Sequence, residues 1–312
     1  MIKMTSIVRG IYYLKHNRAQ FCDSIVKNFF SWLPDKPYLS LRYRFQMGHW
    51  VNWKNPTTFT EKLQWLKIYD YKPEYTKMVD KLAVKDYVAS KIGKEHIIPT
   101  LSVWDKVENI DWESLPSQFV LKTTHGGGGC GVVICSDRAQ FDRDKAIKKL
   151  QISMQSSVGQ LYREKPYLNV PRMIFAEKFM VESKIGDSSN KYELLDYKFF
   201  CFNGKVKFFK IDFDRFVEHH ANYYSTNCEL LSFGESGLEP KPDADIKIPD
   251  NIQEMIELAE KLSKSIPFVR VDFYNVNGSV FFGELTFYPA SGMIPWTPNE
   301  ADFEIGKYLR IK

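Results

Sequence analysis

The stretch from residue 119 to residue 131 joins an apolar run to a lysine and a series of glycines, a combination suited to binding phosphate. It reads Phe-Val-Leu-Lys-Thr-Thr-His-Gly-Gly-Gly-Gly-Cys-Gly, with Lys122 at the end of the apolar run. Glycines let backbone amides point into one concavity, where they bind phosphate oxygens, and a lysine adds a point charge. The Walker A loop places its lysine after the glycines, and the Rossmann fingerprint needs a helix directly after them. Here Val132-Val133-Ile134 continues as a strand, so we expect the loop to join two antiparallel strands and fold over a ligand. A plain glycine turn is the alternative.

A second group of chemically active residues lies between residues 268 and 292. The even positions include Arg270, Asp272 and Glu284, whereas the odd positions are mostly apolar or small. Side chains alternate across a strand, so the pairing register decides which of them share a face. A two-residue turn at Asn277-Gly278 would place Asp272 and Glu284 on opposite faces, whereas a three-residue turn at 276–278 pairs even positions with even ones. Because the apolar pattern requires one undivided core face, we predict the three-residue turn, with the arginine and both carboxylates on one face.

Two carboxylates close together on a hairpin repel each other unless a positive charge lies between them. Arg270 would serve, which would make the group a structural ion network. Oxygen ligands also suit Mg²⁺, which proteins hold by one or two carboxylates together with substrate phosphates. Since the chain has a candidate phosphate loop elsewhere, we favour magnesium, with Asp272 and Glu284 as ligands.

The elements that must position these residues are a mixture of helices and strands, typical of an α+β protein. Hydrophobic periodicity predicts helices starting near 57 and over 76–92, 139–155 and 251–265. We expect strands near 97–103, 118–122, 131–135, 173–178, 195–203 and 205–213, followed by the hairpin at 268–287. Asn203-Gly204 is a strong hairpin signal, and residues 183–191 are expected to form a flexible turn.

Length and composition are those of a folded globular protein with a full apolar core. The chain has 312 residues, enough for two or three subdomains. Its five cysteines include no CxxC pair, which argues against a disulfide framework and a structural zinc site, so we interpret them as reduced thiols in a cytoplasm. We find no apolar run near the ~18 residues of a membrane-spanning helix and recognise no signal peptide.

Positive charge is concentrated in residues 1–60. This segment holds nine Lys and Arg against two Asp, a net charge of +7, whereas the whole chain carries +5 and the remainder therefore −2. One interpretation is a helical cap with a solvated basic face. The other is a docking surface for a polyanionic glycan or for the inner membrane leaflet. No recognition motif supports a nucleic-acid partner.

Taken in their order along the chain, these pieces resemble the ATP-grasp superfamily. The matching pieces are Asp80-Lys81 at a helix start, Lys122 with its glycine loop, the acidic hinge Ala176-Glu177-Lys178-Phe179-Met180, and Arg270-x-Asp272 followed by Glu284-x-Thr286. More closely, the chain resembles the TupA-like ATP-grasp family of surface-polysaccharide gene clusters from about residue 50 to the end. Residues 55–67 (NPTTFTEKLQWLK), 196–205 (DYKFFCFNGK) and 282–289 (FGELTFYP) carry this resemblance.

The resemblance implies an ATP-grasp fold of the α+β class, in which two α+β subdomains clasp ATP. We expect a helical basic N-terminal segment over 1–75, a subdomain with the glycine loop over 76–175, and a subdomain with the metal-binding hairpin over 176–312. ATP and Mg²⁺ would be the cofactors.

The resemblance also implies roles for single residues. Asp272 and Glu284 would bind Mg²⁺, and Arg270 would stabilise the transferred phosphoryl group and the acyl intermediate. The superfamily's usual third metal ligand is asparagine; here it is Thr286, whose hydroxyl binds Mg²⁺ less strongly. The residues expected to bind ATP are Lys81 and Lys122 at the phosphates, His125, Gly126, Gly127, Gly128 and Gly129 in the loop, Glu177, Phe179 and Met180 at the adenine, Asp196 at the ribose, and Lys198.

ATP-grasp enzymes usually join a carboxylate to an amine or a thiol through an acyl phosphate. The resemblance therefore implies an ATP-dependent carboxylate–amine ligase of surface polysaccharide biosynthesis, acting in capsule or glycan modification and forming an amide between an amino acid and a sugar acid. The basic segment would suit an acidic glycan or sugar-acid acceptor. We expect a cytoplasmic enzyme, at the inner face of the membrane if residues 1–60 contact it.

Other interpretations of the sequence stay open. Asp212-Phe213-Asp214 is a D-x-D triplet, which glycosyltransferases use to hold a metal and a nucleotide sugar. The ATP site could instead serve a kinase acting on a sugar hydroxyl, or a non-catalytic nucleotide-binding module. Arg215 is a candidate catalytic residue that would bind the substrate carboxylate or the γ-phosphate, and residues 288–296 are expected to line the acceptor pocket.

Overall fold

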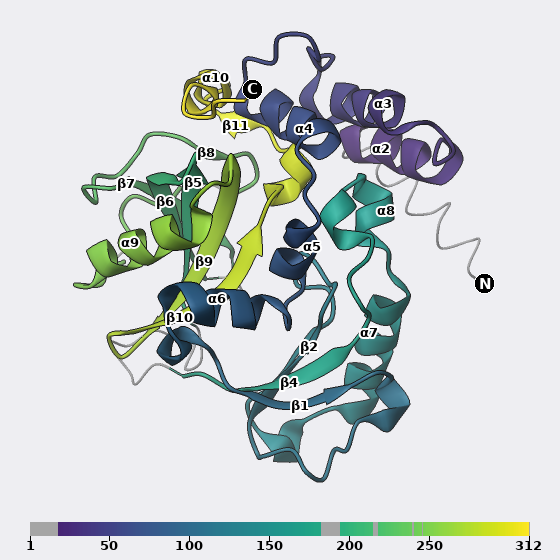
Figure 1. Ribbon diagram of the computed structural model, residues 1–312, viewed down its shortest axis with the longest axis vertical. Helices are drawn as coiled ribbons and strands as arrows, with labels where there is room; N and C mark the ends of the chain where they lie inside the picture. The colour runs from purple at the N-terminus through teal and green to yellow at the C-terminus, as the bar shows by residue number, and fades with distance from the viewer. Residues whose placement is uncertain (1–17, 182–193, 215–217, 239, 245, 312) are drawn as a thin grey trace.

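The computed structural model describes residues 18–181, 194–214, 218–238, 240–244 and 246–311 (Figure 1). The helices are α2 (Arg18–Phe29), α3 (Asp35–Met47), α4 (Phe59–Tyr69), α5 (Glu74–Val79), α6 (Val84–Ile92), α7 (Arg143–Gln155), α8 (Val158–Tyr162), α9 (Ile252–Ser263) and α10 (Glu300–Gly306). The strands are β1 (Thr100–Trp104), β2 (Phe119–Thr123), β3 (Val132–Cys135), β4 (Ile174–Lys178), β5 (Asp196–Phe202), β6 (Lys205–Phe213), β7 (His220–Ser225), β8 (Gly234–Glu235), β9 (Phe268–Val276), β10 (Ser279–Thr286) and β11 (Trp296–Thr297). The mixture agrees with the α+β class expected from the sequence.

The smaller of the two main sheets carries the glycine loop. Its strand order is β1-β4-β2-β3 with antiparallel pairing throughout, and α7 packs on β2 and β3. Along β2, Phe119, Leu121 and Thr123 are buried while Lys122 is only half-buried. Because side chains alternate across a strand, the apolar residues face the core under α7 and Lys122 points the other way.

The larger sheet carries the acidic hairpin. Its order is β10-β9-β5-β6-β7, again antiparallel, and α9 packs against β5, β6 and β9. Figure 1 shows α6 between the two sheets. Its buried Val88 belongs to the same apolar cluster as Phe59 and Leu63 of α4 and Phe199 of β5. The first half of the chain therefore helps to build the core of the larger sheet. The subdomain boundaries expected from the sequence stay a prediction.

The helix predicted over 76–92 is wrong in one respect, because the structure splits it into α5 and α6. Asp80 adopts an extended backbone, and its carboxylate accepts hydrogen bonds from the amides of Leu82 and Ala83 at 2.8 and 3.1 Å. The Lys81 amide donates to the carbonyl of Thr124 at 3.1 Å instead of continuing a helix. Asp side chains compete with helical hydrogen bonding in this way. The break ties Lys81 to the end of β2.

The turn predicted for the C-terminal hairpin is also wrong, although the predicted face is confirmed. Val276 pairs with Ser279, so the turn has two residues, Asn277 and Gly278, both at positive φ (53° and 81°). The register then shifts between Phe282 and Glu284, so that Glu284 pairs with Asp272. A β-bulge inserts one extra residue into one strand and thereby exchanges the two faces beyond it. The bulge at Gly283, and not the turn, therefore brings Glu284 to the same face as Asp272.

Other local predictions are confirmed. The α4 helix begins with a capping box, in which Thr58 accepts from the Glu61 amide. Asn203-Gly204 joins β5 to β6 with both residues at positive φ (50° and 79°). The turn predicted at 183–191 lies outside the described residues.

Within the basic N-terminal segment, α2 and α3 form an antiparallel helical hairpin at a corner of the molecule away from the larger sheet (Figure 1). The buried Arg42 side chain of α3 binds Asp23 of α2, with 2.6 Å between Nε and Oδ1. In the part of the chain that the structure describes, no helix is long and apolar enough to cross a membrane.

Candidate functional site

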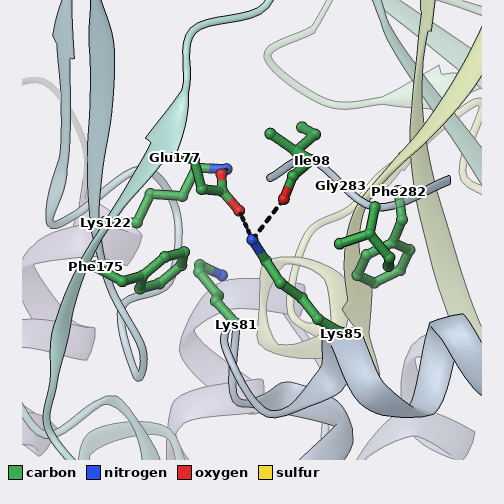
Figure 2. A pocket seen from close by; sticks show the side chains of 9 residues that line it. Lys81, Lys85, Ile98, Lys122, Phe175, Glu177, Phe282 and Gly283 are labelled. Atoms are coloured by element: carbon green, nitrogen blue, oxygen red, sulfur yellow. Dashed lines mark hydrogen bonds and ion pairs between the residues drawn. The ribbon is translucent and has the colours of Figure 1, made fainter. Parts of the chain in front are cut away.

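A pocket lies where the two main sheets and α6 meet (Figure 2). The lysines that line it are Lys81 before α6, Lys85 on α6 and Lys122 on β2. Its remaining lining residues are Ile97, Ile98, Phe175, Glu177, Phe282 and Gly283. The lining itself carries three ammonium groups and one carboxylate, a charge excess that suits an anion, and the apolar residues beside them suit a flat ring.

Glu177 holds two of these lysines. Its Oε1 lies 2.6 Å from Lys85 Nζ and its Oε2 lies 2.6 Å from Lys122 Nζ. Burial opposes ionisation of Glu177, but the two lysines outweigh burial and hold the pKa of the carboxyl below its usual range. Glu177 is therefore a carboxylate that orients both lysines. Its predicted contact with adenine stays a prediction.

Sequence reasoning missed Lys85. Besides Glu177, its ammonium group donates to the carbonyl of Ile98 at 2.9 Å (Figure 2). It also donates to the hydroxyl of Thr100 at 2.7 Å. Burial lowers the pKa of Lys85. The available signal was its spacing, because a residue four positions after Lys81 can lie on the same side of the chain where a helix follows.

The glycine loop connects β2 to β3 as an antiparallel hairpin, as predicted. Within it Gly128 and Gly129 have positive φ (57° and 75°). His125 is buried beneath the loop and its Nε2 lies 3.0 Å from the carbonyl oxygen of Ser153, while burial lowers its pKa. His125 therefore supports the loop from beneath, and its predicted contact with ATP stays a prediction.

Two neighbouring glycines allow a matched test of the loop. A Cβ atom at Gly126 would press against the Cys130 carbonyl oxygen and the Thr123 hydroxyl, whereas one at Gly127 would make ordinary contact with Val158 at 3.7 Å. We expect Gly126→Ala to distort the loop, because overpacking forces the backbone to move. The free energy of unfolding should fall by about 1–3 kcal/mol, and ATP binding should weaken. Gly127→Ala should bind ATP almost normally. Calorimetric titration with Mg-ATP compares them, and equal affinities would show that the loop conformation does not matter for binding.

The acidic hairpin surrounds Arg270. Its guanidinium binds Asp272 through two hydrogen bonds of 2.7 and 2.6 Å, and it lies 3.3 Å from Glu284 Oε1 and 3.2 Å from the Thr286 hydroxyl. Lys81 approaches Glu284 Oε2 at 2.8 Å. Burial raises the pKa of Asp272, whereas Lys81 and Arg270 outweigh burial at Glu284 and lower its pKa. Lys81 thus links the lysine pocket to the hairpin.

The oxygen atoms on this face fit Mg²⁺. Asp272, Glu284 and Thr286 all contact one guanidinium, so their oxygens converge on one region. Among the residues that the structure describes, no group of three His, Cys, Asp or Glu side chains gathers as a metal site. A metal held here would complete its shell with water or with phosphate oxygens, which is how Mg²⁺ is usually bound. The three residues remain predicted ligands.

Asp196 and Lys198 belong to a buried charge network beside the hairpin. Lys198 pairs across the strands with Asp272, and its ammonium group binds Asp212 and lies 3.2 Å from Asp196. Lys210, which pairs with Lys198 on the neighbouring strand β6, binds Glu235 at 2.7 Å. Sequence reasoning did not foresee that Lys198 would join Asp196 to Asp212.

The remaining predicted residues are placed as follows. Phe179 and Met180 are half-buried directly after β4, beside Glu177. Arg215 lies outside the described residues. The stretch 288–296 includes a turn in which Ala290, Ser291 and Gly292 all have positive φ (45°, 58° and 61°). Lys67 of α4 contacts this turn.

Comparison with known proteins identifies the class. The model of the family described as TupA-like ATPgrasp matches residues 61–310, which is most of the chain. The chain therefore belongs to the TupA-like ATP-grasp family, as its motifs predicted, and its fold is the ATP-grasp fold. A search of curated proteins found no match.

Solved structures give weaker similarities. A D-alanine–D-alanine ligase from Bacillus anthracis shares 14% identity over 67% of this chain and 57% of its own, with a TM-score of 0.38. The ADP complex of an N5-carboxyaminoimidazole ribonucleotide synthetase shares 17% over 73% and 50%, with a TM-score of 0.43. A biotin carboxylase from Campylobacter jejuni in complex with a β,γ-ATP ligand shares 15% over 88% and 54%, with a TM-score of 0.42. This chain spans only about half the length of these proteins, and the family match alone carries the assignment.

Proposed function

We propose that this protein is an ATP-dependent ligase that activates a carboxylate as an acyl phosphate and joins it to an amine. The observation that carries the proposal is that Lys81, Lys85 and Lys122 line one pocket. Lys81 also contacts Glu284, on the hairpin that holds Arg270 and Asp272. Membership of an ATP-grasp family supports the same reaction class.

The proposed chemistry has two steps. A carboxylate oxygen of the acceptor attacks the γ-phosphorus of ATP, a new O–P bond forms, and the bond to ADP breaks. The amine nitrogen then attacks the acyl carbon, phosphate leaves, and the nitrogen loses a proton. Lys81, Lys122 and Arg270 would neutralise the charge that develops on phosphate oxygens, since preorganised positive groups stabilise such transition states. Mg²⁺ on the hairpin would add charge neutralisation at the same oxygens.

We infer that the acceptor is an acidic glycan or a sugar acid and that the amine comes from an amino-acid-like compound. The resemblance to a family of surface-polysaccharide gene clusters and the net charge of +7 on residues 1–60 support this choice. A cationic segment attracts an anionic substrate.

The geometry argues against the glycosyltransferase interpretation. Asp212 has 1% of its surface exposed and binds Lys198, with Lys210 3.6 Å away. A carboxylate this deeply buried and neutralised by a lysine is not available to a metal and a nucleotide sugar. A kinase that uses the same ATP site is the alternative that the experiment must distinguish.

Hydroxylamine trapping tests the proposal. The protein is incubated with Mg-ATP, hydroxylamine and a panel of sugar acids, and acyl hydroxamate, ADP and free phosphate are measured. We expect equal amounts of the three with the correct acid, since hydroxylamine captures an acyl phosphate. Lys122→Ala should abolish the product, whereas Lys148→Ala on the exposed face of α7 should not. Phosphate retained on a sugar product would establish a kinase instead, and binding of UDP-sugars without ATP would refute the ATP site.

A further inference from the structure

The turn between α2 and α3 exposes large aromatic side chains. We call residues 29–34, the last residue of α2 and the turn after it, the hairpin tip. Phe29 is 71% exposed there, Trp32 is 74% exposed and Phe30 is 37% exposed. Single exposed apolar residues are ordinary, but three within four positions form a local apolar surface. This surface takes no part in the ATP site.

Hydrogen bonds from the body of the protein hold the backbone of the hairpin tip in place. Arg163, at the end of α8, donates hydrogen bonds to the carbonyl of Ser31 at 2.5 Å and to that of Leu33 at 3.2 Å. The Trp32 indole donates to the Phe29 carbonyl at 3.1 Å. Close behind, the Tyr38 hydroxyl donates to the Leu161 carbonyl at 2.9 Å. The rings are therefore exposed on an anchored backbone and not on a frayed end.

The charge around the hairpin tip is positive. Lys27, Lys36 and Arg163 surround it together with Asp23 and Asp35, which gives a net charge of +1. Lys27 lies 2.6 Å from Asp23, and Arg163 lies 3.5 Å from Asp35. The described residues 18–60 hold six Lys and Arg against two Asp, a net charge of +4. A second copy of this chain would bring an equally positive segment to the contact, so charge repulsion disfavours self-association through this surface. The complementary partner is anionic.

We propose that the hairpin tip docks on an anionic lipid bilayer, with Phe29 and Trp32 inserted among the headgroups. Aromatic rings, tryptophan above all, prefer the membrane–water interface, and nearby lysine and arginine add attraction to anionic lipid. Figure 1 shows the turn between α2 and α3 at a corner of the molecule, and Phe29 and Trp32 are exposed there.

Vesicle co-sedimentation of the full-length protein tests this proposal. Vesicles are made of phosphatidylcholine alone or mixed with phosphatidylglycerol, each at low and high salt. We expect binding to the mixed vesicles that weakens with salt, and little binding to phosphatidylcholine alone. The double variant Phe29→Ser, Trp32→Ser should bind about tenfold more weakly, because membrane affinity scales with the apolar area inserted. Ile152→Ser, which changes a 72% exposed side chain on the lysine-rich α7, should bind like the wild type.

Each outcome of the vesicle experiment either supports the membrane proposal or overturns it. The double variant loses the Trp32–Phe29 hydrogen bond but keeps those from Arg163 to Ser31 and Leu33, and both replaced side chains are exposed. It should therefore keep a melting temperature close to that of the wild type, and ADP binding should be unchanged. Equal vesicle binding by the double variant and the wild type would overturn the proposal. Binding to a soluble polyanionic glycan but not to vesicles would overturn it in favour of a glycan surface, and loss of a wild-type dimer in the double variant would assign the surface to a second copy. The vesicle result does not depend on which reaction the ATP site performs.

Discussion

Lysine in place of Arg270 should lower turnover by about 10²- to 10³-fold, the loss seen when one preorganised donor is removed from a reacting centre. Lysine keeps the positive charge but loses the planar fork that binds both oxygens of Asp272 at 2.7 and 2.6 Å. It also loses the simultaneous contacts with Glu284 and Thr286. ADP release with the acceptor found by hydroxamate trapping measures this effect.

The binding of ATP separates a catalytic role of Arg270 from a structural one. The affinity for Mg-ATP should stay within a few-fold of the wild type, because Lys81, Lys85 and Lys122 remain in the pocket. Arg143→Lys is the matched control, since that guanidinium lies over the Trp112 ring and away from the hairpin. If Arg270→Lys reduces ATP affinity and thermal stability as much as it reduces turnover, Arg270 is part of the structural ion network that the sequence left open.

The hairpin illustrates how far the sequence could predict the site. The alternation of apolar and charged residues was enough to place Arg270, Asp272 and Glu284 on one face, because the core tolerates no other arrangement. It could not locate the extra residue that this face requires. Asn277-Gly278 has its usual two-residue turn, and the shift falls at Gly283, where a single glycine in a strand was the only local sign.

The lysine pocket illustrates what was not predictable. Lys122 and Glu177 were identified as separate motifs, but their direct contact depends on the pairing of β2 with β4. Lys85 looked like an ordinary helix lysine, since the carboxylate and carbonyl that it binds are brought to it by β4 and by the approach to β1. Tertiary contacts of this kind have no signature in local periodicity. Asp212 was misleading for the same reason, because its partner Lys198 lies on the neighbouring strand.

The turn at 288–296 raises a second question, namely what holds Ala290 and Ser291 in the left-handed region. Lys67 of α4 is fully buried, and its ammonium group donates to the Ser291 hydroxyl at 2.5 Å, to the Ser291 carbonyl at 2.8 Å and to the Tyr162 carbonyl at 3.2 Å. Glu164 lies 3.5 Å from this ammonium group and accepts a hydrogen bond from Ser291 at 2.8 Å. Non-glycine residues pay a conformational cost at positive φ, which surrounding contacts must offset.

Lys67→Met should therefore lower the free energy of unfolding by about 3–5 kcal/mol, the usual cost of removing one partner of a buried ion pair. Glu164 would be left with an unpaired buried charge, and the turn carbonyl would lose its donor. Adding Glu164→Gln should recover part of the loss, because it removes that charge.

Lys205→Met is the matched control: its partner Glu260 is 2.6 Å away, but Lys205 is 68% exposed, and such surface pairs contribute below about 1 kcal/mol. Urea denaturation measures all four proteins. Similar losses for Lys67→Met and Lys205→Met would mean that the buried pair does not support the turn.

Replacing Lys67 should also change how the free energy of unfolding depends on pH. Burial lowers the pKa of Lys67 from 10.5 to about 8, so between these values the unfolded chain holds a proton that the folded protein has released. Stability attributable to Lys67 therefore rises as the pH increases through this window, by up to about 1.4 kcal/mol per pH unit. Lys210, whose pKa burial also lowers to about 8, contributes in the same direction and is present in both proteins. Lys67→Met should accordingly show a shallower rise than the wild type between pH 8 and 10.5, and parallel curves would mean that Lys67 keeps its proton in the folded protein throughout.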